Sequence, residues 1–342
     1  PMYWRSDPAM GMPGMGSFMI SAQQMFPNFK KLNAESAYMN SMSSVEQQKK
    51  NFTVNQLNAE AKMNYYKLLV LQRKTKVLDE NERILNLMIE SAELRYKNNM
   101  EKIGAYYKTK AALAKVQAMR IMLEADINKS KIAINTLLSR DKSYAFSIDT
   151  AYTLKAGELF PVDTATFIQN RSDLISVDKQ IELNRLKLNV TSAQLRPEFG
   201  VKYDHMYAFG NQPQLFSLMG MVTIPLAPWS SKMYRSQSRA LQFTSEALKS
   251  EKQMILNDAV GMSQAMREDY TAALKSLSLY DKQILPALKN NFKTFLIGYQ
   301  QNTEELFMLY DAWESLNMTQ MAYLDKLLEA LQMQTELEKL LE

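Results

Sequence analysis

The feature that most constrains this chain is a stretch from Pro27 to Pro161 that contains no other proline, and glycine only at Gly104 and Gly157. Within residues 33–96 apolar side chains recur every three, four or seven residues, which is the spacing of one helix face. They form two neighbouring rows: Met63, Tyr66, Val70, Val77, Ile84, Leu87 and Leu94, and beside them Leu71, Leu78 and Leu85. This apolar arc is wider than the seam of a two-stranded coiled coil. A helix of about 63 residues would extend on the order of 95 Å, far more than a globular domain needs.

The same helical spacing returns in four later segments of the chain. These are residues 103–139, 164–196, 230–299 and 304–341. Pro286 should kink the third of them, because proline removes a backbone hydrogen bond from a helix interior. Residues 141–163 lose the spacing and contain Gly157 and Pro161, so we expect them to form a connector.

Two short stretches alternate in the way that β-strands do. In residues 198–209 one face carries Phe199, Val201, Tyr203, His205, Tyr207 and Phe209. In the stretch that follows, one face carries Phe216, Leu218, Gly220, Val222 and Ile224. A turn rich in Gly, Asn and Pro separates the two stretches. They therefore predict a β-hairpin with one apolar, aromatic-rich side.

The two halves of the chain look alike, which indicates an internal repeat. Residues 16–29 and 219–229 each begin as a strand that reaches a proline just before a long helix. Where each long helix ends, four residues recur at a constant offset of 203: Tyr96, Asn99, Glu101 and Ile103 match Tyr299, Asn302, Glu304 and Leu306. The repeated unit is helix, β-hairpin, long helix, turn and returning helix. We expect the first of the two copies to lack its opening helix because the natural N-terminus is missing.

A membrane explains why an apolar hairpin should accompany such long helices. Strands cross a bilayer only when their edges close into a barrel, and four strands in one chain cannot close. Several chains must then combine, and the wide apolar arc suits a wall in which every helix touches two neighbours. The sequence predicts a mainly α protein with a small β part, in which a β-barrel continues into an α-barrel of long antiparallel α-hairpins.

Several functions are disfavoured by what the sequence lacks. It has no cysteine, which removes thiol chemistry, and its single histidine, His205, is too few for a multi-histidine zinc site and allows a Ser-His-Asp triad only if that one residue serves. We expect no enzymatic activity and no cofactor. The net charge of +5 is spread without blocks of like charge, so we expect no nucleic-acid partner. No run of about 18 apolar residues occurs, so we expect no transmembrane helix.

Short motifs follow one another along nearly the whole chain. They are Asn170-Arg171-Ser172-Asp173-Leu174, Leu195-Arg196-Pro197, Val222-Thr223-Ile224-Pro225-Leu226, Gly298-Tyr299, and Glu305-Leu306 followed by Asp311. In this order and spacing they resemble the TolC-like outer-membrane efflux proteins, and most of all the heavy-metal efflux branch of that family.

The resemblance implies a homotrimer with a 12-stranded transmembrane β-barrel among the lipids of a Gram-negative outer membrane, and with a helical tunnel in the periplasm. It implies a passive conduit that works with an inner-membrane pump and a periplasmic adaptor, with heavy-metal ions as one candidate cargo. Residues 1–29, as an incomplete copy, and 197–228 would be the outer-membrane β-hairpins. The periplasmic helical hairpins would be residues 30–140 and 229–342, joined through an equatorial connector at 141–163 and a helix of the second repeat at 164–196.

The resemblance also implies functional residues at the two helical breaks. An adaptor would dock at the tip formed by Asn98, Asn99, Met100, Glu101, Gln301, Asn302 and Thr303. Relatives close this tip with a tyrosine, an arginine and two aspartates, and the matching positions here are Tyr299, Glu304, Met308 and Asp311. Because Glu304 replaces the arginine and Met308 one aspartate, the closing network should differ. The asparagines suit these turns, since Asn follows glycine in tolerating a left-handed backbone.

Other interpretations stay open at this point. Met10, Met12 and Met15 fall in a loop rich in Gly and Pro, where their thioethers could bind Cu(I) or Ag(I). Methionine elsewhere follows helix seams, where it is core. Asp311 could simply lie on a solvated helix face. An elongated coiled-coil scaffold without channel activity would also explain the helices, although it would not need the apolar faces of the hairpin.

Overall fold

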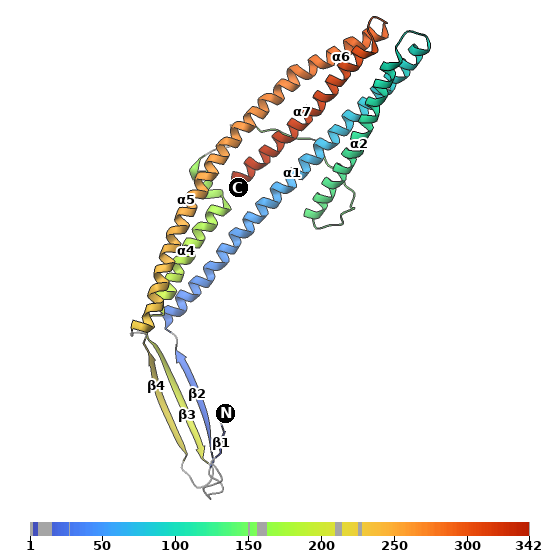
Figure 1. Ribbon diagram of the computed structural model, residues 1–342. Coiled ribbons are helices and arrows are strands. Elements are labelled where there is room, and N and C mark those ends of the chain that lie inside the picture. The colour runs from blue at the N-terminus through green and yellow to red at the C-terminus, as the bar shows by residue number, and fades with distance from the viewer. Residues whose placement is uncertain are drawn as a thin grey trace. The chain divides into compact units, whose positions relative to one another are not determined.

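A computed structural model of the chain describes residues 3–5, 16–26, 28–149, 151–155, 163–208, 214–224 and 228–341 (Figure 1). The chain divides into two compact units. Unit 1 contains residues 1–50 and 173–255, and unit 2 contains residues 51–172 and 256–342.

Helices account for most of the described residues. They are α1 (Phe29–Lys97), α2 (Ile103–Leu137), α3 (Thr164–Asn170), α4 (Ser172–Ala193), α5 (Pro228–Leu279), α6 (Leu285–Gln300) and α7 (Leu306–Leu341), with a π-helical segment, Tyr280–Ile284, between α5 and α6. Each predicted helical segment is present. The one predicted over residues 164–196 is broken at Arg171, and the Asp163 carboxylate begins α3 by accepting a hydrogen bond from the Ala165 amide at 3.2 Å.

In unit 1, four strands form one antiparallel sheet in the order β1-β2-β3-β4. The strands are β1 (Tyr3–Arg5), β2 (Gly16–Phe26), β3 (Glu198–Ala208) and β4 (Leu215–Thr223). The predicted hairpin is the β3–β4 pair, and the predicted strand near the N-terminus is β2, which pairs with β3. The short β1 carries too few residues to show an alternating pattern.

The register of the sheet places the apolar positions of neighbouring strands side by side. Ile20 lies opposite His205, and Tyr203 lies opposite Leu218. In the single chain this face has no cover, since Phe216 and Leu218 are 73% and 71% exposed. The opposite face mixes methionines with polar residues, among them the ion pair of Lys202 and Asp204 at 2.9 Å. Phe209, predicted for the apolar face, lies outside the described residues.

In unit 2, one row of α1 residues is buried in the first of two hydrophobic clusters. Leu71, Leu78 and Leu85 are buried, whereas Leu87 and Leu94 of the other predicted row are exposed. The buried row shares one cluster with residues of α2 and α7, including Val116, Leu309 and Trp313. A second cluster joins α1, α5 and α7 and takes in Tyr152 and Leu154 of the connector. The other row is buried in part, since Val70 lies in the second cluster and Ile84 packs against the first. Sequence periodicity found both rows, but the packing of α2, α5 and α7 decides which residues of each are buried.

A π-helical segment lies just before Pro286, the residue at which a kink is predicted. Buried residues on α5 follow a seven-residue spacing through Tyr270 and Leu277, and the row then continues at Leu285 and Tyr299. Ile284, predicted for this seam, is exposed instead. A π turn holds more residues than an α turn, so it accommodates one extra residue just before the proline, whose missing N–H cannot complete the regular hydrogen-bond ladder.

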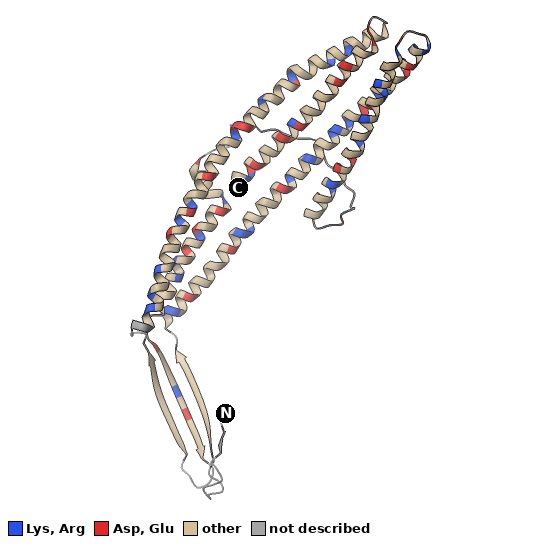
Figure 2. Ribbon diagram, in the orientation of Figure 1, with Lys and Arg blue, Asp and Glu red and all other residues tan. Residues whose placement is uncertain are grey.

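Charged residues of both signs are spread along the helices, and few lie on the strands (Figure 2). Among the helices that the structure describes, none combines the length and apolar character that crossing a membrane requires.

We expect Asn81→Ala to destabilise unit 2 by about 1–3 kcal/mol, because it leaves the buried indole N–H of Trp313 without an acceptor. In the structure that N–H donates to the Asn81 Oδ1 at 2.6 Å. The measurement is thermal unfolding of the detergent-purified protein. Asn86→Ala, on the exposed face of the same helix, is the control. Equal unfolding temperatures for the two variants would contradict the assignment.

Candidate functional site

Both helical turns of unit 2 end with the same backbone hydrogen bonds. After α1 the Met100 amide donates to the Arg95 carbonyl at 2.8 Å, and after α6 the Thr303 amide donates to the Gly298 carbonyl at 2.9 Å. A second, shorter-range bond precedes each, from Asn99 to Tyr96 and from Asn302 to Tyr299. This pair of bonds is the Schellman arrangement, which satisfies the last carbonyls of a helix. The four-residue match at an offset of 203 thus corresponds to two turns of one geometry.

The asparagines hold the position in each turn that requires a left-handed backbone. Asn99 has φ 57° and Asn302 has φ 62°. The predicted role of asparagine is therefore confirmed at these two positions. Asn98 does not adopt this conformation, and its side-chain amide instead donates to the Leu94 carbonyl at 2.9 Å.

A cleft opens between the two turns, which lie at the same end of unit 2 (Figure 1). Its lining residues are Arg95, Asn99, Met100, Glu101, Lys102, Asn302, Thr303, Glu304 and Glu305. Six of the residues predicted for the tip or the gate thus line one feature. Asn98 and Gln301 are exposed nearby but do not line the cleft.

Tyr299 joins the end of α6 to α1. Its side chain is only 3% exposed, and the Arg95 guanidinium carbon lies 3.8 Å from the centre of its ring. The same guanidinium donates a hydrogen bond to the Tyr299 carbonyl. Burial raises the pKa of the Tyr299 phenol, so the ring stays neutral beside its cation. This contact ties the two turns together within one chain.

Asp311 makes the second link, between α7 and α2. Its Oδ1 lies 2.9 Å from the Lys108 Nζ. That amine also lies 3.6 Å from the centre of the Phe307 ring and 4.1 Å from the centre of the Tyr310 ring. Asp311 therefore does more than face solvent: it forms part of a cluster that holds a cation.

Glu304 and Met308 are placed differently from the two residues above. Glu304 packs closely on the preceding turn, where a Cβ added at Gly298 would lie 2.5 Å from the Glu304 Cγ. Glycine at that position thus leaves room for the returning chain. Met308 is 45% exposed on α7. The structure does not bring either residue into the contacts made by Tyr299 and Asp311.

Sequence reasoning missed Arg95 and Lys108, the two cations that bind the predicted gate residues. Lys108 stands at the offset of 203 from Asp311, so the repeat already placed opposite charges at matching positions. Arg95 stands at the same offset from Gly298. No pattern in the sequence indicates that Lys108 and Asp311, at equivalent positions of the two halves, would meet.

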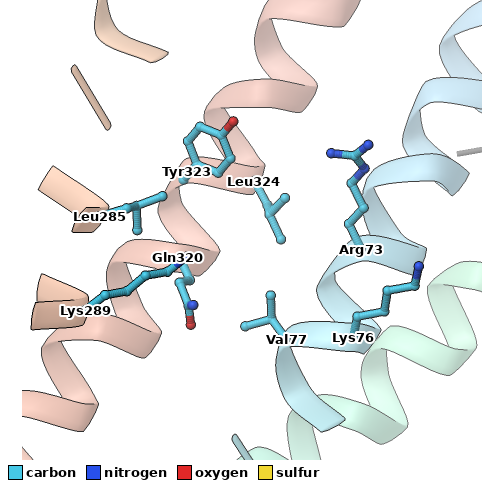
Figure 3. A pocket seen from close by; sticks show the side chains of 8 residues that line it. All are labelled: Arg73, Lys76, Val77, Leu285, Lys289, Gln320, Tyr323 and Leu324. Atoms are coloured by element: carbon cyan, nitrogen blue, oxygen red, sulfur yellow. The ribbon is translucent and has the colours of Figure 1, made fainter. Parts of the chain in front are cut away.

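A separate pocket lies between α1, α6 and α7, away from the turns (Figure 3). Val77, Leu285 and Leu324 point toward one another in it, while Arg73 and Lys289 enter from opposite sides (Figure 3). None of the tip or gate residues predicted from the sequence lines this pocket. Met10, Met12 and Met15 lie outside the described residues. Within those residues no cluster of three or more His, Cys, Asp or Glu side chains is arranged to hold a metal ion.

We expect Asn99→Ala to weaken the first turn, because alanine tolerates a left-handed backbone less well than asparagine. A cost of about 1 kcal/mol would speed hydrogen exchange of the Met100 amide roughly fivefold. Asn99→Gly should leave the rate unchanged, and Asn98→Ala is the control beside it. Equal rates in Asn99→Ala and Asn99→Gly would show that the backbone conformation is not what selects asparagine.

Solved structures provide the comparison with known proteins. No protein-family model and no curated protein matches the sequence. The Campylobacter jejuni CmeC outer-membrane channel matches with a TM-score of 0.80 at 11% identity, over 99% of this chain and 76% of that one. The Vibrio cholerae outer-membrane protein VceC matches with a TM-score of 0.77 at 16% identity, over 99% and 84%. The open state of the Neisseria gonorrhoeae MtrE outer-membrane channel matches with a TM-score of 0.76 at 14% identity, over 99% and 78%.

The likeness extends over almost the whole chain, so it includes the sheet, the helices and both turns. The resemblance to TolC-like proteins predicted from the sequence motifs is thus confirmed at the level of the fold. This chain has the fold of the outer-membrane channel proteins.

Proposed function

We propose that the chain is one subunit of an outer-membrane channel, the passive exit duct of a tripartite efflux system. The observation that carries the proposal is the match to outer-membrane channels over almost all of this chain. The chain itself performs no chemistry in this proposal. Cargo crosses the outer membrane through a water-filled lumen, and an inner-membrane pump, acting through a periplasmic adaptor, supplies the energy.

The sheet supports a membrane location for unit 1. One face carries exposed apolar and aromatic side chains, and the other carries the Lys202–Asp204 pair. This is the arrangement of a barrel strand that faces lipid on one side and water on the other. The outer edge of β4 has no partner strand among the described residues. An open edge is unstable in a bilayer, so three chains of four strands would close a 12-stranded barrel.

The two turns of unit 2 serve as the periplasmic tip in this proposal. Their cleft presents polar and charged residues on a fixed backbone, which suits the docking of an adaptor. Tyr299 and Asp311 contribute to the closed state through Arg95 and Lys108, with Glu304 and Met308 close by in sequence. Selection of cargo, heavy-metal ions among the candidates, would rest with the pump.

The first test is the assembly itself. We expect the detergent-purified protein to be a trimer by native mass spectrometry and to form ion-conducting pores in planar bilayers. Replacing Leu218 by Asp should abolish insertion, because a charge on the lipid face of a barrel costs about 2–4 kcal/mol near the midplane for basic residues and somewhat less for acidic ones. Met219→Asp, on the opposite face and across from Lys202, is the control. A detergent-free monomer or dimer would favour the scaffold instead.

The second test addresses the gate. We expect Arg95→Ala to increase the open fraction of single channels about 2- to 30-fold, which corresponds to loss of a cation–π contact. Arg83→Ala, an exposed arginine on the same helix, is the control. Asp311→Ala should also weaken block by multivalent cations added to the periplasmic side. Unchanged conductance and unchanged block in Asp311→Ala would remove that residue from the gate.

A further inference from the structure

The Lys108 amine lies in a site that α7 alone provides. Within one turn of that helix Phe307, Tyr310 and Asp311 all direct their side chains at it, two with ring faces and one with a carboxylate. Both ring centres lie within 4.1 Å of the nitrogen, well inside the range of about 6 Å over which aromatic faces attract cations. Two ring faces and a carboxylate can bind other alkylammonium ions as well as the amine of a lysine side chain.

Neighbouring residues on α7 hold this site in place. The Tyr310 hydroxyl donates to the Glu314 Oε1 at 3.1 Å, and the ring packs 5.5 Å from that of Trp313. Burial raises the pKa of the Tyr310 phenol to about 12, so it remains a neutral donor. Glu314 also adds a second negative charge beside the rings. Tyr310 also lies in a buried cluster with Ala112 and Val116 of α2, so packing from both helices fixes the ring whether or not the lysine amine is present.

We propose that Phe307, Tyr310 and Asp311 form a binding site for alkylammonium ions, which Lys108 occupies as a substitute ligand. Phe307 and Asp311 are both about half exposed, so a small ion can reach the site from solvent once the amine leaves. Quaternary ammonium groups suit it because they need no hydrogen-bond acceptor and bind through ring faces and charge.

Such a site would couple ligand binding to the contact between the hairpins. A bound ammonium ion and the Lys108 amine cannot share the site, so the ligand must compete with the link between α2 and α7. By the reciprocity of coupled equilibria, loosening that link must strengthen ligand binding by the same factor. This goes beyond the passive duct proposed above, since it gives one helix a preference for organic cations.

The experiment uses choline as the cation and 3,3-dimethylbutan-1-ol as its neutral analogue of the same shape. Binding to the full detergent-purified protein is followed by saturation-transfer NMR of the methyl protons. We expect Lys108→Ala to bind choline at millimolar concentrations, at least about tenfold more tightly than the unmodified protein, because the internal competitor is gone. Lys110→Ala removes the same charge from the same helix and should behave like the unmodified protein.

Further variants separate the site from a general effect of charge. In the Lys108→Ala background, Asp311→Asn and Phe307→Ala should each weaken choline binding about tenfold, whereas the neutral alcohol should not bind to any variant. Lys108→Ser empties the same site and replaces Lys108→Ala in the experiment if the alanine variant does not assemble. Equal choline binding by the Lys108 and Lys110 variants, or equal binding of the alcohol, would overturn the proposal. Because the measurement involves no transport, that result would leave the proposed duct intact.

Discussion

Burial of one row of leucines along α1 is the interaction on which the rest of unit 2 depends. Leu71, Leu78 and Leu85 share one hydrophobic cluster with residues of α2 and α7, so this row of leucines holds both helices to α1. In proteins, most of the stability of a helix comes from the packing of its apolar face. The neighbouring row is buried at Val70 but exposed at Leu87 and Leu94, so the end of α1 near the turn carries uncovered apolar side chains in the single chain. The proposed assembly would cover these side chains with another subunit.

The contacts at the turns show how two similar backbones can carry complementary side chains. At one link Arg95 of the first copy contacts Tyr299 of the second, while Gly298, the counterpart of Arg95, leaves room for Glu304. At another position the first copy has Lys108 and the second has Asp311. The second link therefore joins equivalent positions of the two halves that carry opposite charges. Two lysines or two aspartates at these positions would set like charges together.

Local patterns predicted the helices, the hairpin and the left-handed asparagines, because each depends on residues close in sequence. The structure bears this out for Asn99 and Asn302, whose backbone requirement lies within one turn. Which residues of each α1 row are buried, and which residues contact Tyr299 and Asp311, could not be predicted in the same way. Those depend on which distant helices meet, and nothing in the spacing of Arg95 or Lys108 reveals it. The apolar face of the sheet was predictable, whereas in the proposed barrel closure of that sheet would depend on other chains.

The π-helical segment between α5 and α6 has a consequence for how the length of this chain can vary. Tyr270 and Leu277 lie on one side of it, and Leu285 and Tyr299 continue the same buried row on the other, one residue out of step. Elsewhere in a long helix, one added or lost residue would turn everything beyond it by about 100° and bring polar side chains into the core. Here the wider turn takes up the difference. Residues 280–284 are thus a place where a single-residue deletion could restore an ordinary α turn while both ends of the helix keep their neighbours.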